Sequence, residues 1–237
     1  MIKLRVEEIQ IEVHDPVFFS TREANKKITT GRYLHNYALT YSLLYASGEL
    51  DSLTEYSKTW EKTSEEGPKY QEDFENLGMY VFPARPVDVD FTTEIVNTSS
   101  ETYHEAVTGE RAKRYFSGHT LKRIAVGSEF KTYALIEDDI TLPSTSRLGK
   151  FMGKIKMENE ERDWRKEERK DARIEPVLNV MDLPSKFHSS TSQMKVQKMR
   201  PSPVMTSAVF SGECIVLENG DKEVLPHNVG YFKKEEN

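Results

Sequence analysis

Cysteine is almost absent from this sequence of 237 residues, and no long apolar run occurs in it. The single cysteine, Cys214, cannot form an internal disulfide, and a lone thiol does not make a cysteine metal cluster. No stretch approaches the roughly 18 uninterrupted apolar residues that a membrane-spanning helix needs. The beginning of the chain, MIKLRVEEIQ, carries charges where a signal peptide needs its apolar region. We therefore expect a cytoplasmic protein that has no membrane segment and is held together by packing.

Motifs of the common catalytic and cofactor sites are also missing. The chain contains no GxxxxGK(S/T), GxGxxG, GxSxG or HExxH pattern, and its histidines are scattered singly. We expect no cofactor, no metal ion and no catalytic residue. One enzymatic alternative remains, because metal-free RNA cleavage needs only a general base and a general acid. His14 and His35 flank one predicted loop, so a metal-independent endoribonuclease is kept as the second hypothesis.

Negative charge is concentrated in one segment of the chain. The net charge is −6, and residues 49–75 alone hold nine acidic and three basic residues, so the remainder is neutral overall. A polyanion responds to the local field within about 8–10 Å rather than to the total charge. An RNA-binding protein is therefore not excluded, and we expect the acidic segment to face away from the RNA. The opposite sign dominates residues 108–133, which contain Arg111, Lys113, Arg114, Lys122, Arg123 and Lys131.

Hydrophobic periodicity predicts strands around one buried helix. Residues 2–13 alternate with a slip at Glu7 and Glu8, which we interpret as one strand with a bulge. Residues 34–46 have apolar side chains at helical spacing, and Gly48 follows as a stop. The acidic segment is predicted to be a solvated helix or loop. Residues 158–173 are predicted to form an exposed charged helix. Strands are predicted in MYVFPARP, LKRIAVG, EFKTYALIE and the last third of the chain.

This order of elements indicates an α+β fold close to the split βαβ plan of RNA-recognition modules. We expect residues 1–157 to form an RRM-type domain that includes the acidic insert. Residues 158–237 are expected to add the charged helix and a β-rich part packed on the same domain.

The segment RLGKFMGK, residues 147–154, carries the clearest binding pattern. Gly149 and Gly153 allow a tight turn or a close approach of the backbone to a ligand. Phe151 between cations could stack a nucleobase, as in single-stranded RNA sites. The alternative is an ordinary strand edge protected by lysines. The cations of this segment are Arg147, Lys150, Lys154 and Lys156.

Four separated segments together resemble one family. They are HDPVFFSTRE (14–23), LHNYALTYSLLYA (34–46), YVFPARP (80–86) and RLGKFMGK (147–154). In this order and spacing they resemble the Cas5-type subunit of type I-D CRISPR interference complexes, the Csc1 family. The resemblance implies a RAMP protein with an RRM-like ferredoxin sheet and an elaborated second half.

The resemblance also implies a role. Such a subunit is a non-catalytic cap that holds the 5′ handle of the guide RNA (crRNA). It joins the large, Cas10-type subunit to the repeated Cas7-type backbone subunits. Target double-stranded DNA near the flanking motif is a further implied neighbour.

For the site, the resemblance places Arg22, His35, Asn36 and Arg85 together beside the RNA handle. If the helix begins near Tyr33, His35 and Asn36 lie in its first turn, where unpaired backbone N–H groups and the positive end of the dipole favour an anion. In the alternative, His35 and Asn36 only cap loops, and Arg85 pairs with Glu23. Arg111, Lys113 and Arg114 are the next candidates for RNA contact.

Overall fold

The structure is a computed structural model. It describes residues 4–24, 27–48, 70, 74, 77–96, 119–137, 140–218 and 223–230. Almost all of the acidic segment 49–75 lies outside these ranges, and so do Arg111, Lys113 and Arg114.

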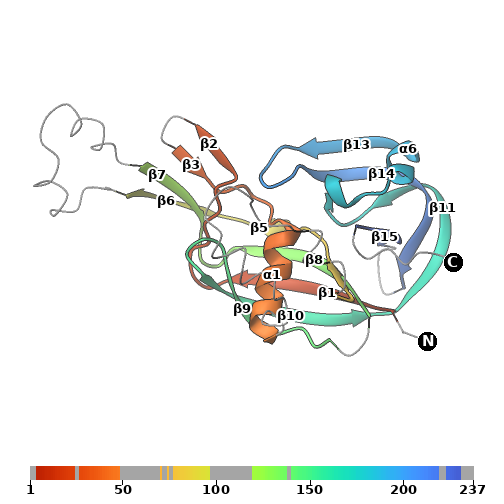
Figure 1. Ribbon diagram of the computed structural model, residues 1–237, viewed down its shortest axis with the longest axis horizontal. Helices are drawn as coiled ribbons and strands as arrows, with labels where there is room; N and C mark the ends of the chain where they lie inside the picture. Colours follow the sequence, from red (N-terminus) through yellow and green to blue (C-terminus); the bar gives the residue numbers. More distant parts are fainter. Residues whose placement is uncertain are drawn as a thin grey trace, which may run out of the picture.

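A larger antiparallel sheet forms the centre of the fold (Figure 1). Its strands follow the order β4-β8-β1-β10-β9, and β5 also pairs with β8. Since β1 and β4 are each antiparallel to β8, they run parallel to one another with β8 between them. The described chain connects them through α1, so this part is a split βαβ unit. The strands are β1 (Leu4–Val13), β4 (Met79–Val81), β5 (Arg85–Asp88), β8 (Glu129–Glu137), β9 (Thr145–Leu148) and β10 (Gly153–Arg162).

The predicted buried helix is present as α1 (Asn36–Ser47), which ends at Gly48 with a left-handed φ of +80°. It lies on one face of the larger sheet (Figure 1). There it shares a hydrophobic core with strand residues such as Ile9 and Ile155. Ser42 Oγ donates a hydrogen bond to Ser146 Oγ of β9 at 2.7 Å, which fixes the position of the helix along the sheet. The helix residues in this core are Tyr37, Leu39, Leu43 and Leu44.

The predicted bulge in the first strand is wrong. β1 pairs with β8 and β10 without a register shift. The apolar pattern changes at Glu7 and Glu8 because the strand is covered on both faces in different places. Val6 packs against the C-terminal half, whereas Ile9 and Val13 pack under α1. A change of covering element therefore produces the same sequence pattern as an inserted residue.

The C-terminal half is a second antiparallel sheet built around the long strand β14 (Val204–Leu217). Two short helices, η2 (Val180–Asp182) and α6 (Ser185–Ser189), lie between its strands in the sequence. A second core joins this sheet to the larger one, because Val6, Phe82 and Leu135 cluster with Ile215 and Leu225. The strands paired with β14 are β11 (Trp164–Ile174), β12 (Leu178–Asn179), β13 (Thr191–Gln197) and β15 (Val224–Pro226).

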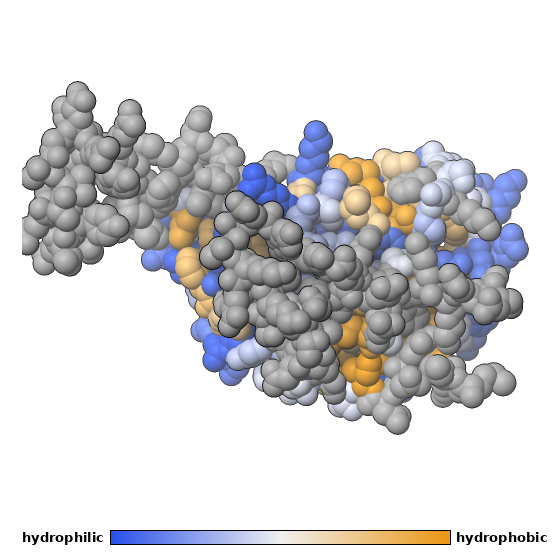
Figure 2. Space-filling view, viewed as in Figure 1, coloured by the Kyte–Doolittle hydropathy of each residue, from blue (hydrophilic) through white to orange (hydrophobic). Residues whose placement is uncertain are grey.

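The charged helix predicted for residues 158–173 is wrong, because this segment forms the end of β10 and most of β11. Its charges pair across strands and along them at a spacing of two residues. Lys166 Nζ lies 2.7 Å from Glu213 Oε1 on β14, and Arg169 Nε lies 2.5 Å from Glu167 Oε2. Figure 2 shows hydrophilic surface along the margin where β11 lies in Figure 1. The charge pattern therefore belongs to an exposed strand.

A small sheet extends from the side of the larger one (Figure 1). Its order is β2-β3-β7-β6, and its β3–β7 pair is parallel. Val17 forms an isolated antiparallel bridge with Ile124 at the end of β7, which ties this sheet to the loop after β1. Its strands are β2 (Arg22–Ala24), β3 (Lys27–Thr29), β6 (Phe91–Val96) and β7 (His119–Ile124).

Candidate nucleic-acid interface

The predicted glycine-bearing segment forms the tight turn between β9 and β10. Gly149 has a φ of +79°, and Met152 has a φ of +53°. A Cβ atom on Gly149 would lie 2.7 Å from the carbonyl oxygen of Phe18. That oxygen accepts a hydrogen bond from the Lys150 backbone N–H at 2.9 Å. The glycine is therefore needed because the turn sits directly on the loop after β1.

Phe151 stands at the tip of this turn and is 54% exposed. Its ring stacks on Phe18, with ring centroids 5.3 Å apart and an interplanar angle of 19°. The guanidinium of Arg123 lies 5.0 Å from the Phe151 ring centroid. Arg123 also forms an ion pair with Glu94. An exposed aromatic ring beside cations is a combination that is typical of surfaces in contact with single-stranded nucleic acid.

The four predicted cations of this segment differ in how far their charge is neutralised. Arg147 Nη1 lies 3.4 Å from Asp15 Oδ2, and Lys156 Nζ lies 2.7 Å from Glu158 Oε1. The hydrogen bond to Glu158 raises the pKa of Lys156 above its ordinary value. Lys150 and Lys154 are exposed, and neither pairs with a carboxylate of the described residues. Their charge is the part of this surface that is available to a phosphate group.

His35 and Asn36 lie in the interior. His35 Nδ1 accepts a hydrogen bond from the Tyr37 backbone N–H at 3.3 Å, and Nε2 lies 2.9 Å from Ser202 Oγ. Burial lowers the pKa of His35 to about 4, so the ring is neutral at neutral pH. Asn36 is fully buried and donates to Asp182 Oδ2 at 2.7 Å. Both side chains are satisfied inside the fold and leave no polar atom at the surface for RNA.

Asp182 is the centre of this polar network, which links α1 to the C-terminal half. Its carboxylate accepts hydrogen bonds from Tyr37 Oη at 2.8 Å and from Tyr80 Oη at 2.9 Å. Asn179 Nδ2 donates to Asn36 Oδ1 at 3.2 Å. Burial raises the pKa of Asp182, although the hydrogen bonds from Tyr37, Tyr80 and Asn36 oppose the shift. The head of α1 is therefore an anchor between the two halves of the chain.

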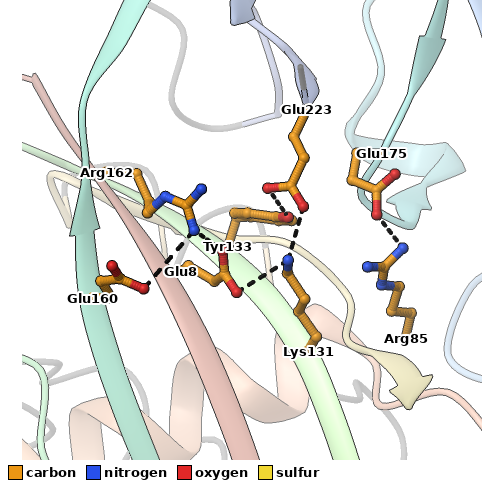
Figure 3. A network of polar contacts seen from close by, with 8 residues as sticks. All are labelled: Glu8, Arg85, Lys131, Tyr133, Glu160, Arg162, Glu175 and Glu223. Carbon is orange, nitrogen blue, oxygen red and sulfur yellow. Dashed lines mark hydrogen bonds and ion pairs between the residues drawn. The ribbon is translucent and has the colours of Figure 1, made fainter. Parts of the chain in front are cut away.

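The described side chains of His35, Asn36 and Arg85 do not form the predicted cluster. Arg85, on β5, forms an ion pair with Glu175 between β11 and β12 (Figure 3), and the side chain of Glu23, its partner in the alternative, lies outside the described part of the chain. Arg22 begins β2, and only its backbone is described. His35 and Asn36 point into the interior instead of joining Arg85.

A second polar network lies beside Arg85, between the larger sheet and the C-terminal half (Figure 3). Lys131 Nζ lies 3.0 Å from Glu8 Oε1 and 2.8 Å from Glu223 Oε1. Tyr133 Oη donates to Glu223 Oε2 at 2.6 Å. Burial raises the pKa of Tyr133, and its bond to Glu223 raises it further. Because its cations are matched by carboxylates, this network fits a structural joint better than a phosphate site.

The two histidines of the nuclease hypothesis lie in different surroundings. His14 is exposed just after β1, and its Nε2 lies 3.3 Å from Glu12 Oε2. His35 is buried at the start of α1. Within the described part of the chain, no group of three or more His, Cys, Asp or Glu side chains is placed to hold a metal ion. None of the described helices is both long and apolar enough to cross a membrane.

Phe18 and Arg123 are functional candidates that the sequence interpretation missed. Phe18 is buried, and only the fold shows that it supports Phe151. Arg123 carried a detectable signal, because Lys122 and Arg123 are adjacent in a predicted strand and must point to opposite faces. Two cations on opposite faces of one strand indicate that each face meets a different part of the molecule or a ligand.

A comparison with protein families finds one match over nearly the whole chain. The family model described as "Type I-D CRISPR-associated protein Cas5/Csc1" matches residues 4–234. No curated protein is similar enough to count as a match.

The comparison with solved structures finds chains that are distant in sequence. One is the "Cryo-EM structure of the Type III-B Cmr-beta bound to cognate target RNA and AMPPnP, state 1", with 11% identity and a TM-score of 0.42, covering 89% of this chain and 86% of that one. Another is the "Crystal structure of a CRISPR protein from Archaeoglobus fulgidus", with 9% identity and a TM-score of 0.39, covering 96% of this chain and 99% of that one.

Proposed function

Because this chain belongs to the type I-D CRISPR-associated Cas5/Csc1 family, we propose that it is a non-catalytic guide-RNA-binding subunit of a type I-D effector complex. In this role it holds the 5′ handle of the crRNA and joins the large, Cas10-type subunit to the Cas7-type backbone subunits. The sequence of the target is then read by pairing with the guide, so the protein needs to recognise only the handle. A RAMP-type ferredoxin sheet with a β-rich second half is part of the same proposal.

The observation that carries the proposal is the exposed turn between β9 and β10. The exposed part of the Phe151 ring is available for contact with an unpaired base, and Lys150 and Lys154 offer charge for the flanking phosphates. Arg147 and Lys156 add cations whose charge is shared with Asp15 and Glu158. Handle RNA is single-stranded, and this combination suits a single strand because stacking and phosphate contacts tolerate any base.

In the proposed position beside the large subunit, this protein would also lie near target double-stranded DNA. We propose this contact as secondary to handle binding. The proposal names the kinds of partner subunit and not the surfaces that contact them. The purification described next tests for these partners together with the RNA.

Purification after co-expression tests the proposal. The chain is produced with the neighbouring effector subunits and a guide array, and the complex is isolated through a tag on this subunit. We expect a small RNA to co-elute, and ultraviolet crosslinking should join handle nucleotides to the peptide that contains Phe151. A stable complex that lacks this subunit but keeps the same RNA and the same handle protection would contradict the proposal.

Among the described residues, no observation favours the nuclease hypothesis. General acid-base cleavage needs two groups that are oriented toward one ribose and that change protonation near neutral pH. His35 is buried with a pKa of about 4, and His14 is at the surface beside Glu12. The hypothesis is tested by the cleavage assay described below.

A further inference from the structure

One face of the larger sheet is covered at only one end. Successive residues of β1 point to opposite faces, and the even-numbered ones from Val6 to Glu12 lie on the face away from α1. Val6 packs against the C-terminal sheet, and Glu8 belongs to the polar network of Figure 3. Beyond them a groove of about 500 Å³ crosses β5, β8, β1 and β10. We call this uncovered part of the sheet the open face, and its side chains are Gln10, Glu12, Val87, Glu129, Lys156 and Glu158.

Every cation that lines this groove is already paired with a carboxylate. Two carboxylates of the open face, Glu12 and Glu129, are not matched in this way. Among the described residues, the only ion-pair partner of Glu12 is His14, which carries a charge only when it is protonated, and Glu129 has none. The open face therefore keeps an excess of negative charge. The paired cations are Arg85 with Glu175, Lys131 with Glu8 and Glu223, and Lys156 with Glu158.

The two unmatched carboxylates face each other across neighbouring strands. Glu12 of β1 lies directly opposite Glu129 of β8. On its other side Glu12 faces Lys156 of β10, whose ammonium group is held by Glu158 at 2.7 Å. Like charges directly opposite each other destabilise a sheet, whereas a lysine in place of either glutamate would stabilise it. Because both side chains are exposed, the pair does not serve folding, and a role in binding explains it.

An exposed apolar side chain accompanies these charges. Val87 lines the groove, is 61% exposed, and lies at the register shift in β5 between Pro86 and Asp88. The negative charge of the open face repels a nucleic acid. Within the described part of the chain, no group of three or more His, Cys, Asp or Glu side chains is placed to hold a metal ion. Carboxylates beside an apolar side chain suit a Lys or Arg, because its aliphatic stem packs on apolar surface while its charged end meets the carboxylates.

We propose that the open face is a docking surface for a basic segment of a Cas7-type backbone subunit. A Lys or Arg of that segment places its charged end at Glu12 and Glu129 and its aliphatic stem against Val87. The choice of partner rests on the proposed function, in which repeated backbone subunits adjoin this chain. A repeated subunit suits a long RNA, and a protein that lies along RNA carries Lys and Arg at its surface. Its charge therefore complements that of the open face.

The test uses the complex that is purified through a tag on this chain after co-expression with the neighbouring subunits and a guide array. Glu12→Gln/Glu129→Gln removes both charges and keeps the size of the side chains. The matched control, Glu161→Gln/Glu168→Gln, removes two exposed carboxylates of β10 and β11 that do not line the groove. We expect the open-face variant to retain about 5-fold less of the Cas7-type subunit after a wash at about 0.3 M salt. The control should retain as much as the unaltered chain.

Two further measurements separate docking from folding. The open-face variant loses a repulsive pair, so its melting temperature should be equal to or higher than that of the unaltered chain. Carboxylate labelling with a carbodiimide and glycinamide compares the isolated chain with the chain in the complex. We expect Glu12 and Glu129 to be protected from labelling in the complex, whereas Glu161 and Glu168 are labelled equally in both.

Three results would overturn the proposal. The open-face variant could retain the Cas7-type subunit at the level of the unaltered chain, it could lose the Cas10-type subunit instead, or Glu12 and Glu129 could be labelled equally in the isolated chain and in the complex. The co-eluting RNA separates this proposal from the guide-binding role. A complex that forms without RNA contradicts that role alone. A complex that contains RNA and is insensitive to the open-face variant contradicts the docking proposal alone.

Discussion

Asp182 is the residue through which the start of α1 is fixed to the C-terminal half. Two tyrosine hydroxyls and the Asn36 amide donate to its carboxylate, and Asn179 and Ser202 extend the network to His35. Except for Asn179 and Ser202, every member lies more than 100 residues from Asp182 in the sequence. A buried carboxylate is tolerated here because each of its oxygens has a donor.

The pH dependence of folding tests the state of His35. The pKa of His35 is about 4 in the folded protein and about 6.5 in the unfolded chain. Between these values the unfolded chain binds the proton more strongly, so the free energy of unfolding falls as the pH falls from about 7 to about 4. His35→Asn keeps a capping oxygen but does not titrate. When the pH is lowered from about 7 to about 5, the free energy of unfolding should fall by up to about 2 kcal/mol less in this variant than in the unaltered protein. Urea denaturation measures the difference.

Asp182 contributes a pH dependence of the opposite sign. Because its pKa is raised in the folded protein, its contribution to the free energy of unfolding is lost as the pH rises through that pKa. Both proteins carry Asp182, so its contribution cancels in the comparison. Equal pH dependence in both would mean that His35 is charged in the folded protein.

The roles of these residues mark a limit of sequence interpretation. A histidine and an asparagine before an apolar helix are typical both of a cap and of an anion site, and the sequence left the two open. The partners that decide between them, Asp182 and Ser202, lie more than 140 residues away. Long-range pairing of this kind leaves no local pattern.

At the scale of elements, α1 could be predicted because its apolar side chains and Gly48 are local signals. β11 could not, because interleaved charges also suit an exposed helix. A finer pattern was available, since Arg165, Glu167 and Arg169 alternate in sign at a spacing of two residues. Such residues share a face in a strand but not in a helix. The predicted turn at Gly149 is confirmed, because its glycine chemistry is local as well.

Gly149 offers a direct test of the close contact beneath the turn. In Gly149→Ala the new Cβ would lie 2.7 Å from the Phe18 carbonyl oxygen. The alanine would also have to adopt a left-handed φ. Gly127 has a φ of +81° with nothing within 4 Å, so Gly127→Ala isolates the cost of the backbone conformation. We expect Gly149→Ala to lower the free energy of unfolding by at least about 1 kcal/mol more than Gly127→Ala. Equal losses would place Phe18 farther from the turn.

The lysines of the same turn separate binding from folding. Lys150→Ala/Lys154→Ala removes two exposed cations, so we expect each substitution to change stability by no more than about 0.5 kcal/mol. Binding of the handle RNA should weaken at low salt, with the salt slope lower by about 0.7 per lost phosphate contact. Thermal melting and fluorescence titration measure the two effects. Unchanged affinity and an unchanged salt slope would indicate that these lysines only protect a strand edge from pairing.

In the described part of the molecule, the two larger hydrophobic cores lie on opposite faces of the larger sheet. One face of that sheet packs under α1, and the other packs against the C-terminal sheet. A boundary at residue 157 would divide β10, whose residues up to Arg162 pair with β1. We therefore expect residues 1–157 alone not to fold, and the full chain to unfold in a single transition seen equally by circular dichroism and tryptophan fluorescence. Two separate transitions would show independent halves.

RNA cleavage would require acid and base groups from different parts of the molecule to act on one ribose. We expect the full-length chain to leave a repeat-containing RNA uncut at neutral pH in the presence of a chelator. His14 has only Glu12 as a described partner, and His35 is buried and neutral. Product analysis on a denaturing gel measures the result. Specific cleavage that disappears in His14→Ala or His35→Asn would establish the nuclease instead.

The passage of the chain from the larger sheet to the C-terminal one occupies the single residue Asp163. β10 ends at Arg162, β11 begins at Trp164, and the Asp163 carbonyl oxygen accepts a hydrogen bond from the Glu218 backbone N–H at 2.9 Å. Inserting or deleting one residue here would exchange the two faces of every later position in β11. Related proteins can therefore gain or lose residues in their loops during evolution, but they should keep the length of this junction while its sequence drifts.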